Sequence, residues 1–117
     1  MSNRNQTVGG WGENVAAGYL EQRGYKVTAR NVRTPYGEID IVAEKEGFII
    51  FIEVKTRTSR SLGPPEISVT PRKQEHMLAA AEYYTQQNEI DHWQIDVIAV
   101  VGIPGKRIEF THFENAI

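Results

Sequence analysis

The chain contains no cysteine among its 117 residues. Disulfide bonds, zinc sites built on thiolates and thiol nucleophiles are therefore all excluded. Long apolar runs are also missing, because the longest two, residues 48–52 and 97–101, have five residues each, whereas a membrane-spanning helix needs about 20. Residues 1–10 are polar and lack the apolar segment of a signal peptide. We therefore expect a cytoplasmic protein that does not enter a membrane.

A glycine-rich phosphate-binding loop is absent as well, which argues against a nucleotide hydrolase. No repeat, low-complexity segment or linker divides the chain, and 40% of its residues are hydrophobic and 24% charged, as in ordinary globular proteins. The length suits one compact domain and is too short for two. We predict a single domain over residues 1–117, with residues 1–7 as a disordered tail.

The net charge is slightly negative, at −2, which argues against a protein that coats nucleic acid unselectively. Basic residues are nevertheless concentrated between residues 54 and 73, where five of them accompany a single acidic residue. Such a patch can attract a polyanion even on an acidic protein, and a solvated loop explains it equally well. The candidates for binding DNA phosphates are Arg57, Arg60, Arg72 and Lys73. Lys73 is favoured among them because it lies near a predicted helix N-terminus.

Hydrophobic periodicity and turn residues predict two helices and five strands. Apolar residues three or four apart predict a first helix that ends at Gly24, and Thr70 and Pro71 are typical of the cap and first position of a second. Residues 48–56 are apolar on both faces, as in a central strand covered on both sides. In order, the predicted elements are helix 8–23, strands 25–32, 38–44 and 48–56, helix 71–88, and strands 93–101 and 107–112. This order predicts an α/β domain with a mixed sheet flanked by helices.

Ionisable residues lie at both ends of a strongly apolar hairpin, GEIDIVAEKEGFIIFIEVKTR. Side chains alternate along a strand, so Glu53 and Lys55 share one face. Whether Asp40 lies on that face depends on the register of the two strands. With the turn at residues 45–46, Asp40 is diagonal to Glu53; a shift of two residues puts them directly opposite, and a shift of one puts them on opposite faces. A site therefore requires an even shift.

Two carboxylates near apolar surface repel each other unless a cation lies between them. Mg²⁺ or Mn²⁺ would remove the conflict, since Mg²⁺ prefers oxygen ligands and a bound metal can polarise a phosphoryl oxygen and activate water. The ammonium of Lys55 could orient the attacking water or stabilise charge on phosphorus. The spacing thus predicts metal-assisted phosphodiester hydrolysis. On spacing alone, a structural role is at least as good an explanation, with Glu53 paired to Lys55 and Asp40 capping a turn.

The segments GEID and FIEVKTR together resemble the motif of the PD-(D/E)xK nuclease superfamily. From GENVAAGYLEQRGYKV to QIDVIAVV, nearly the whole chain resembles the small bacterial YraN family, which is related in fold to archaeal Holliday-junction resolvases. The resemblance implies a restriction-endonuclease-like core, with Asp40 and Glu53 as metal ligands and Lys55 as the catalytic lysine. In the resolvase-like branch a first-helix glutamate completes the site, and Glu13 has that position. Glu13 equally suits charge–dipole stabilisation of the helix N-terminus.

The sequence departs from the superfamily pattern before the aspartate, where Ile39 stands in place of the usual proline. Glu38 could assist as a ligand, although an exposed hairpin position is the expectation. Asp96 interrupts the apolar strand QIDVIAVV, and we expect it to be hydrogen-bonded beside the motif strands rather than catalytic. No role is assigned to the three histidines, which show no metal-ligand spacing: His76, His92 and His112.

The sequence leaves three functions open. The first is a Mg²⁺- or Mn²⁺-dependent DNA endonuclease, selective for branched or otherwise structured DNA, as the resemblance to the resolvases implies. The second is a nucleic-acid-binding module that keeps the nuclease fold with little or no chemistry. The third is an interaction or scaffold protein whose acidic cluster is structural. A homodimer would suit two symmetric cuts on a junction.

Overall fold

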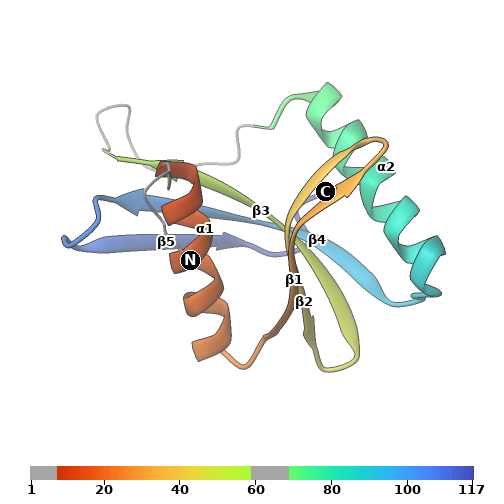
Figure 1. Cartoon of the computed structure of the whole chain (residues 1–117), viewed down its shortest axis with the longest axis horizontal. Coiled ribbons are helices and arrows are strands. Elements are labelled where there is room, and N and C mark those ends of the chain that lie inside the picture. The colour runs from red at the N-terminus through yellow and green to blue at the C-terminus, as the bar shows by residue number, and fades with distance from the viewer. Residues whose placement is uncertain (1–7, 59–68) are drawn as a thin grey trace.

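The computed structural model describes residues 8–58 and 69–117 of the chain. Within these ranges the elements are α1 (Val8–Gln22), β1 (Lys26–Thr34), β2 (Gly37–Lys45), β3 (Phe48–Arg57), α2 (Pro71–Asn88), β4 (Trp93–Gly102) and β5 (Ile108–Phe113) (Figure 1). The predicted α/β class and the predicted order of helices and strands are confirmed. The predicted tail at residues 1–7 and the candidate Arg60 lie outside the described residues. Neither described helix combines the length and apolar character that crossing a membrane requires.

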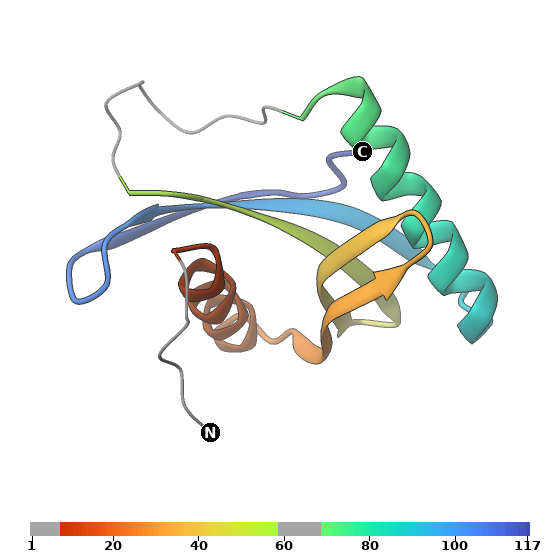
Figure 2. The ribbon, with the colours of Figure 1, turned by 45° about the horizontal axis from the view of Figure 1, so that its top comes forward.

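The five strands form one mixed sheet in the order β1-β2-β3-β4-β5. Strand β3 is central, as its two apolar faces predicted, and pairs antiparallel with β2 and parallel with β4. The two helices lie on opposite sides of this sheet (Figure 2). Helix α1 packs through Ala16, Ala17 and Leu20, whereas α2 packs through Ala80 and Ala81. Because alanine side chains are small, they let a helix approach the strands closely.

The turn between β2 and β3 consists of Glu46 and Gly47, so that Lys45 pairs with Phe48. Both turn residues have positive φ, 53° and 85°. Positive φ at both positions is typical of a type I′ turn, whose twist matches that of the strands it joins. The turn lies one residue later than residues 45–46, and the register is therefore shifted by two, which is an even shift.

Helix α2 begins where the sequence predicted. Thr70 is extended (φ −65°, ψ 156°), and its hydroxyl oxygen accepts a hydrogen bond from the backbone N–H of Lys73 at 3.1 Å. Pro71 follows in the first turn, where its missing N–H costs nothing. The cap thus determines where Lys73 lies relative to the sheet.

The first half of α1 lies very close to the end of β3. A Cβ atom built on Gly12 would come within 2.9 Å of both Cβ and Cγ2 of Thr56, and nearer still to its Oγ1. Only glycine fits this space without movement of the helix or the strand. The contact also places the next residue, Glu13, beside the sheet.

Gly12→Ala is expected to destabilise the protein by about 1–3 kcal/mol, the usual cost of overpacking, although alanine is the better helix former by about 1 kcal/mol. Gly18 in the same helix is the matched control, because a Cβ there meets nothing within 4 Å. Gly18→Ala should therefore stabilise by up to about 1 kcal/mol. Urea-induced unfolding measures both changes. Equal stabilisation by the two substitutions would contradict the close packing of α1 on Thr56.

Candidate active site

Asp40 and Glu53 come together where β2 separates from β3. The last paired residues are Ile41 and Ile52, so Asp40 and Glu53 come next on the two strands. Because side chains alternate and Val42 and Phe51 pack on the α2 side, both carboxyl groups lie on the face that α2 covers. Beyond this point the tip of the β1–β2 hairpin curves toward α2 (Figure 1). The Oδ2 atom of Asp40 accepts a hydrogen bond from the backbone N–H of Val54 at 2.9 Å. The Asp40 side chain thus occupies the place of a strand-to-strand hydrogen bond.

The two carboxyl groups are largely buried and interact with each other. Burial is the largest influence on each and raises both pKa values. The charge of Asp40 raises the pKa of Glu53 further. For Asp40, the hydrogen bond from Val54 and the charge of Lys73 lower the pKa by less than burial raises it. Carboxyl groups in this condition take up either a proton or a cation.

Two lysines supply positive charge at the pair. Nζ of Lys73 in α2 lies 3.5 Å from Oε2 of Glu53. Lys55 lies two residues beyond Glu53 on the same face of β3, and its charge also lowers the pKa of Glu53, which burial nevertheless keeps raised. The amines therefore come from two elements on the side of the sheet that α2 covers.

Glu13 approaches from α1, on the opposite side of the sheet. Its pKa is raised first by burial and then by the charge of Asp40, and it is lowered by Arg30, whose guanidinium lies 3.9 Å from the Glu13 carboxylate. Within residues 8–58 and 69–117, no three His, Asp or Glu side chains lie close enough together to hold a metal ion. Glu13 thus acts on Asp40 electrostatically without joining it and Glu53 in a three-ligand group, and its role as a ligand stays a prediction.

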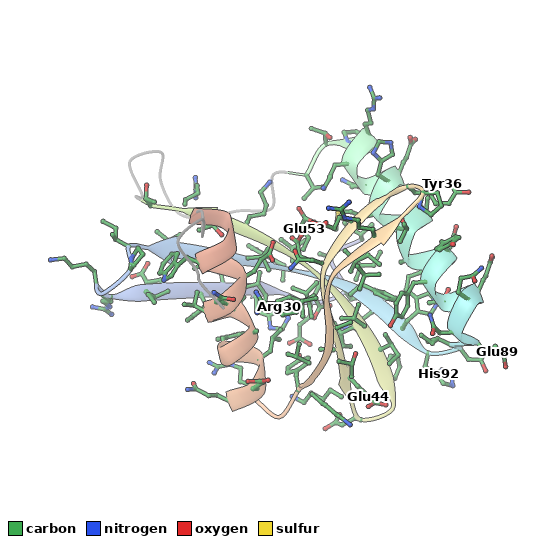
Figure 3. The ribbon with its side chains drawn as sticks, in the orientation of Figure 1. Arg30, Tyr36, Glu44, Glu53, Glu89 and His92 are labelled. Atoms are coloured by element: carbon green, nitrogen blue, oxygen red, sulfur yellow. The ribbon has the colours of Figure 1, made fainter. Side chains whose placement is uncertain are left out.

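A small cavity of about 40 Å³ opens beside the acid pair, with room for a few water molecules. Its walls are the tip of the β1–β2 hairpin, β3 and α2, with Asp40, Glu53 and Lys73 among the polar lining residues and Phe51 and Met77 among the apolar ones. Figure 3 shows Glu53 beside the hairpin and Tyr36 at its tip, near α2.

This donor set fits a magnesium or manganese ion. Asp40 and Glu53 offer carboxylate oxygens, and burial raises the pKa of both, so their charged forms are disfavoured unless a cation lies beside them. Mg²⁺ commonly binds through one or two carboxylates and keeps several waters, which the cavity can hold. The chemistry of the two carboxylates therefore suits such an ion, and its binding stays a prediction.

The sequence matches the model of the Uncharacterised protein family UPF0102 over residues 12–100. The chain belongs to the UPF0102 (YraN) family. A UPF0102 protein of Syntrophotalea carbinolica is 44% identical over 118 residues, which cover 99% of this chain and 95% of the relative. A UPF0102 protein of Syntrophomonas wolfei is 42% identical, covering 96% of this chain and 98% of the relative. A third, from Roseiflexus castenholzii, is 37% identical and covers 100% and 98%.

Three further predicted residues of this UPF0102 chain lie on the elements that carry the site. Glu38 is exposed, as expected, and forms an ion pair with Arg33 at 3.8 Å. Arg57 ends β3 on the face of Glu53, and Arg72 is exposed in the first turn of α2. These two basic residues therefore lie on the elements that carry Glu53 and Lys73, and their contact with DNA stays a prediction.

Asp96 is completely buried in β4 and well supplied with hydrogen bonds. It accepts from the Gln94 amide at 2.9 Å and from the Asn115 N–H at 2.8 Å, and Nε2 of His112 lies 2.7 Å from its Oδ2. The expected hydrogen-bonded role is confirmed. His112, to which the sequence assigned no role, belongs to this structural network. Because β4 and β5 pair with Ile98 opposite His112, a prediction of that register would have indicated the contact.

Asp40→Asn is expected to stabilise the metal-free protein at neutral pH. Asparagine keeps an oxygen that can accept the Val54 N–H and removes the buried charge that opposes Glu53. Burial raises the pKa of Asp40, so just above pH 3.8 the folded protein binds more protons than the unfolded chain. The folded state is fully stabilised by this proton below the pKa that Asp40 has in the unfolded chain. The stabilisation is lost as the pH rises through the pKa that Asp40 has in the folded protein. Because asparagine does not ionise, the Asp40→Asn protein does not lose this stability as the pH rises.

Thermal unfolding in EDTA, from acidic to neutral pH, measures the effect. The Tm of Asp40→Asn should exceed that of the unsubstituted protein at neutral pH and depend less on pH. Asp91→Asn, at an exposed position, is the control for removing one carboxylate. A Tm of Asp40→Asn below that of the control at neutral pH would mean that the charged hydrogen bond to Val54 outweighs burial.

Proposed function

We propose that this UPF0102 protein is a Mg²⁺- or Mn²⁺-dependent DNA endonuclease that hydrolyses phosphodiester bonds. The observation that carries the proposal is the convergence of Asp40 and Glu53, which are largely buried and follow the last pair of β2 and β3, with Lys55 on the same face. Ionisable groups with perturbed pKa values cluster at active sites. A largely buried acidic pair opposes folding, and a divalent cation is the ligand that makes it favourable.

Each residue has a role that its position supports. Asp40 and Glu53 would hold the cation, with Glu13 adding negative charge from the α1 side. When bound, Mg²⁺ or Mn²⁺ supplies a Lewis acid for the phosphoryl oxygen and lowers the pKa of water. Lys55 would donate to the phosphate and stabilise the negative charge that develops on it. The proposed catalytic set is therefore Glu13, Asp40, Glu53 and Lys55.

The basic residues around the acid pair support binding of a DNA backbone. Arg57 lies further along β3, and Arg72 and Lys73 lie in the first turn of α2. Phosphate contacts position DNA without reading its sequence, so this set suits a nuclease without sequence specificity. Selectivity for branched DNA is added by analogy with the resolvases of the superfamily, and the cytoplasm is where such a protein would meet its substrate.

A nucleic-acid-binding module with little or no catalysis is the second candidate. The ion pair between Lys73 and Glu53 favours it, because it indicates an acidic pair that the protein neutralises in part by itself. Such a module would bind DNA in a salt-sensitive manner. Its affinity for DNA would depend more on Arg72 and Lys73 than on Glu53.

The nuclease predicts cleavage of branched, single-stranded or duplex DNA by the purified protein with Mg²⁺ or Mn²⁺. Asp40→Asn, Glu53→Gln and Lys55→Ala should each lower the rate by on the order of 100-fold or more, because each removes a charge at the reacting phosphate or its cation. Gel analysis of end-labelled DNA measures the rate, and circular dichroism checks the fold. Glu44→Gln, exposed on the same strand as Asp40, is the control and should cut normally. Undiminished cleavage by all three substituted proteins would refute the assignment.

A further inference from the structure

Lys73 reaches the acid pair from a different element of the fold. Its Nζ lies 3.5 Å from Oε2 of Glu53, a side chain that is only 16% exposed, whereas the Lys73 side chain is 47% exposed. Burial raises the pKa values of Asp40 and Glu53 most, and Lys73 is the strongest positive charge that lowers them; for Glu53 it acts more strongly than Lys55. The ammonium of Lys73 is thus a principal counter-charge of this pair.

The backbone and the side chain of Lys73 are held differently. Its N–H donates to the Thr70 cap at 3.1 Å, and the next residue, Gln74, donates through its side chain to the Val69 carbonyl at 3.0 Å. The first turn of α2 is therefore well anchored. The amine, in contrast, lies at the end of a flexible four-carbon stem that lines the cavity. The ammonium can move by several ångströms without any change in the helix.

We propose that Lys73 is a built-in counter-ion that occupies the place of the divalent cation in the metal-free protein and gives it up when the cation binds. The proposal rests on the metal site of the proposed function. An ammonium beside Glu53 and a divalent cation held by the same carboxylate repel each other, so Lys73 must move outward along the cavity. There its three donors are available to a DNA phosphate. The metal ion and the Lys73 ammonium thus compete for the Glu53 carboxylate. When DNA is bound, one of its phosphates accepts hydrogen bonds from the displaced ammonium.

The competition is tested by titrating the DNA-free protein with Mn²⁺ and measuring free Mn²⁺ by electron paramagnetic resonance. Lys73→Met keeps most of the stem and removes the charge, and we expect its Kd for Mn²⁺ to fall by roughly threefold to tenfold, in line with the loss of one partly exposed charge interaction. Lys73→Arg should return the Kd to that of the unsubstituted protein. Lys106→Met, at an exposed position in the turn between β4 and β5, is the control, because Lys106 is not among the main charges acting on either carboxyl.

A second measurement follows the counter-ion in the absence of metal. In EDTA, Lys73→Met should lower the Tm, whereas in a Glu53→Gln background the same substitution should change it little, because the partner charge is gone. A Kd for Mn²⁺ that is equal or higher in Lys73→Met than in Lys106→Met overturns the proposal, as does an equal loss of Tm in both backgrounds.

The outcome separates this proposal from the nuclease. Tighter Mn²⁺ binding by Lys73→Met in a protein that cuts no DNA supports the counter-ion and refutes the nuclease. If the protein cuts DNA and its Kd for Mn²⁺ is the same with and without the Lys73→Met substitution, the nuclease is supported and the counter-ion is refuted. If neither the unsubstituted protein nor Lys73→Met binds Mn²⁺, both proposals fail.

Discussion

The two-residue turn at Glu46 and Gly47 is the constraint on which the candidate site depends. It sets the register of β2 against β3, whose last pair is Ile41 and Ile52, and that register brings Asp40 and Glu53 together just beyond the pair. A slip of one residue would move one carboxylate to the other face of the sheet. Glu46 has a φ of 53°, which costs a non-glycine residue about 1–2 kcal/mol. The apolar side chains that β2 and β3 bury between two helices hold the hairpin against this strain.

The protein contains two kinds of buried acid, and their surroundings differ. Asp96 is completely buried, and its carboxylate has three protein partners, including His112. Nothing further is needed to make its burial tolerable. Asp40 and Glu53, in contrast, face each other, and burial leaves both pKa values raised despite the hydrogen bond from Val54 and the charge of Lys73. The first arrangement is complete within the protein, whereas the second leaves two carboxyl groups whose charge the protein offsets only in part.

The position of the acid pair also explains how a buried site can be reached. At the end of the β2–β3 pairing the hairpin curves toward α2, and the cavity opens in the space between them. The two helices contribute charges of opposite sign from opposite sides, Glu13 from α1 and Lys73 from α2. The packing of Gly12 on Thr56 and the Thr70 cap keep these helix ends in place. The charge balance of the site therefore depends on packing at some distance from it.

The sequence by itself determined the helices and strands, and it determined which consecutive strands pair with each other. The predicted helix at residues 71–88 is α2, because Thr70 and Pro71 fix its start through local contacts. The apolar run at residues 48–52 was enough to predict the central strand. The sequence left the hairpin register open, since apolar residues on both faces of β3 permit more than one pairing. The tertiary structure alone decided that Lys73 meets Glu53 and that Gly12 meets Thr56. These contacts join residues far apart in the chain, so they depend on how each helix packs on the sheet, and no local preference encodes that.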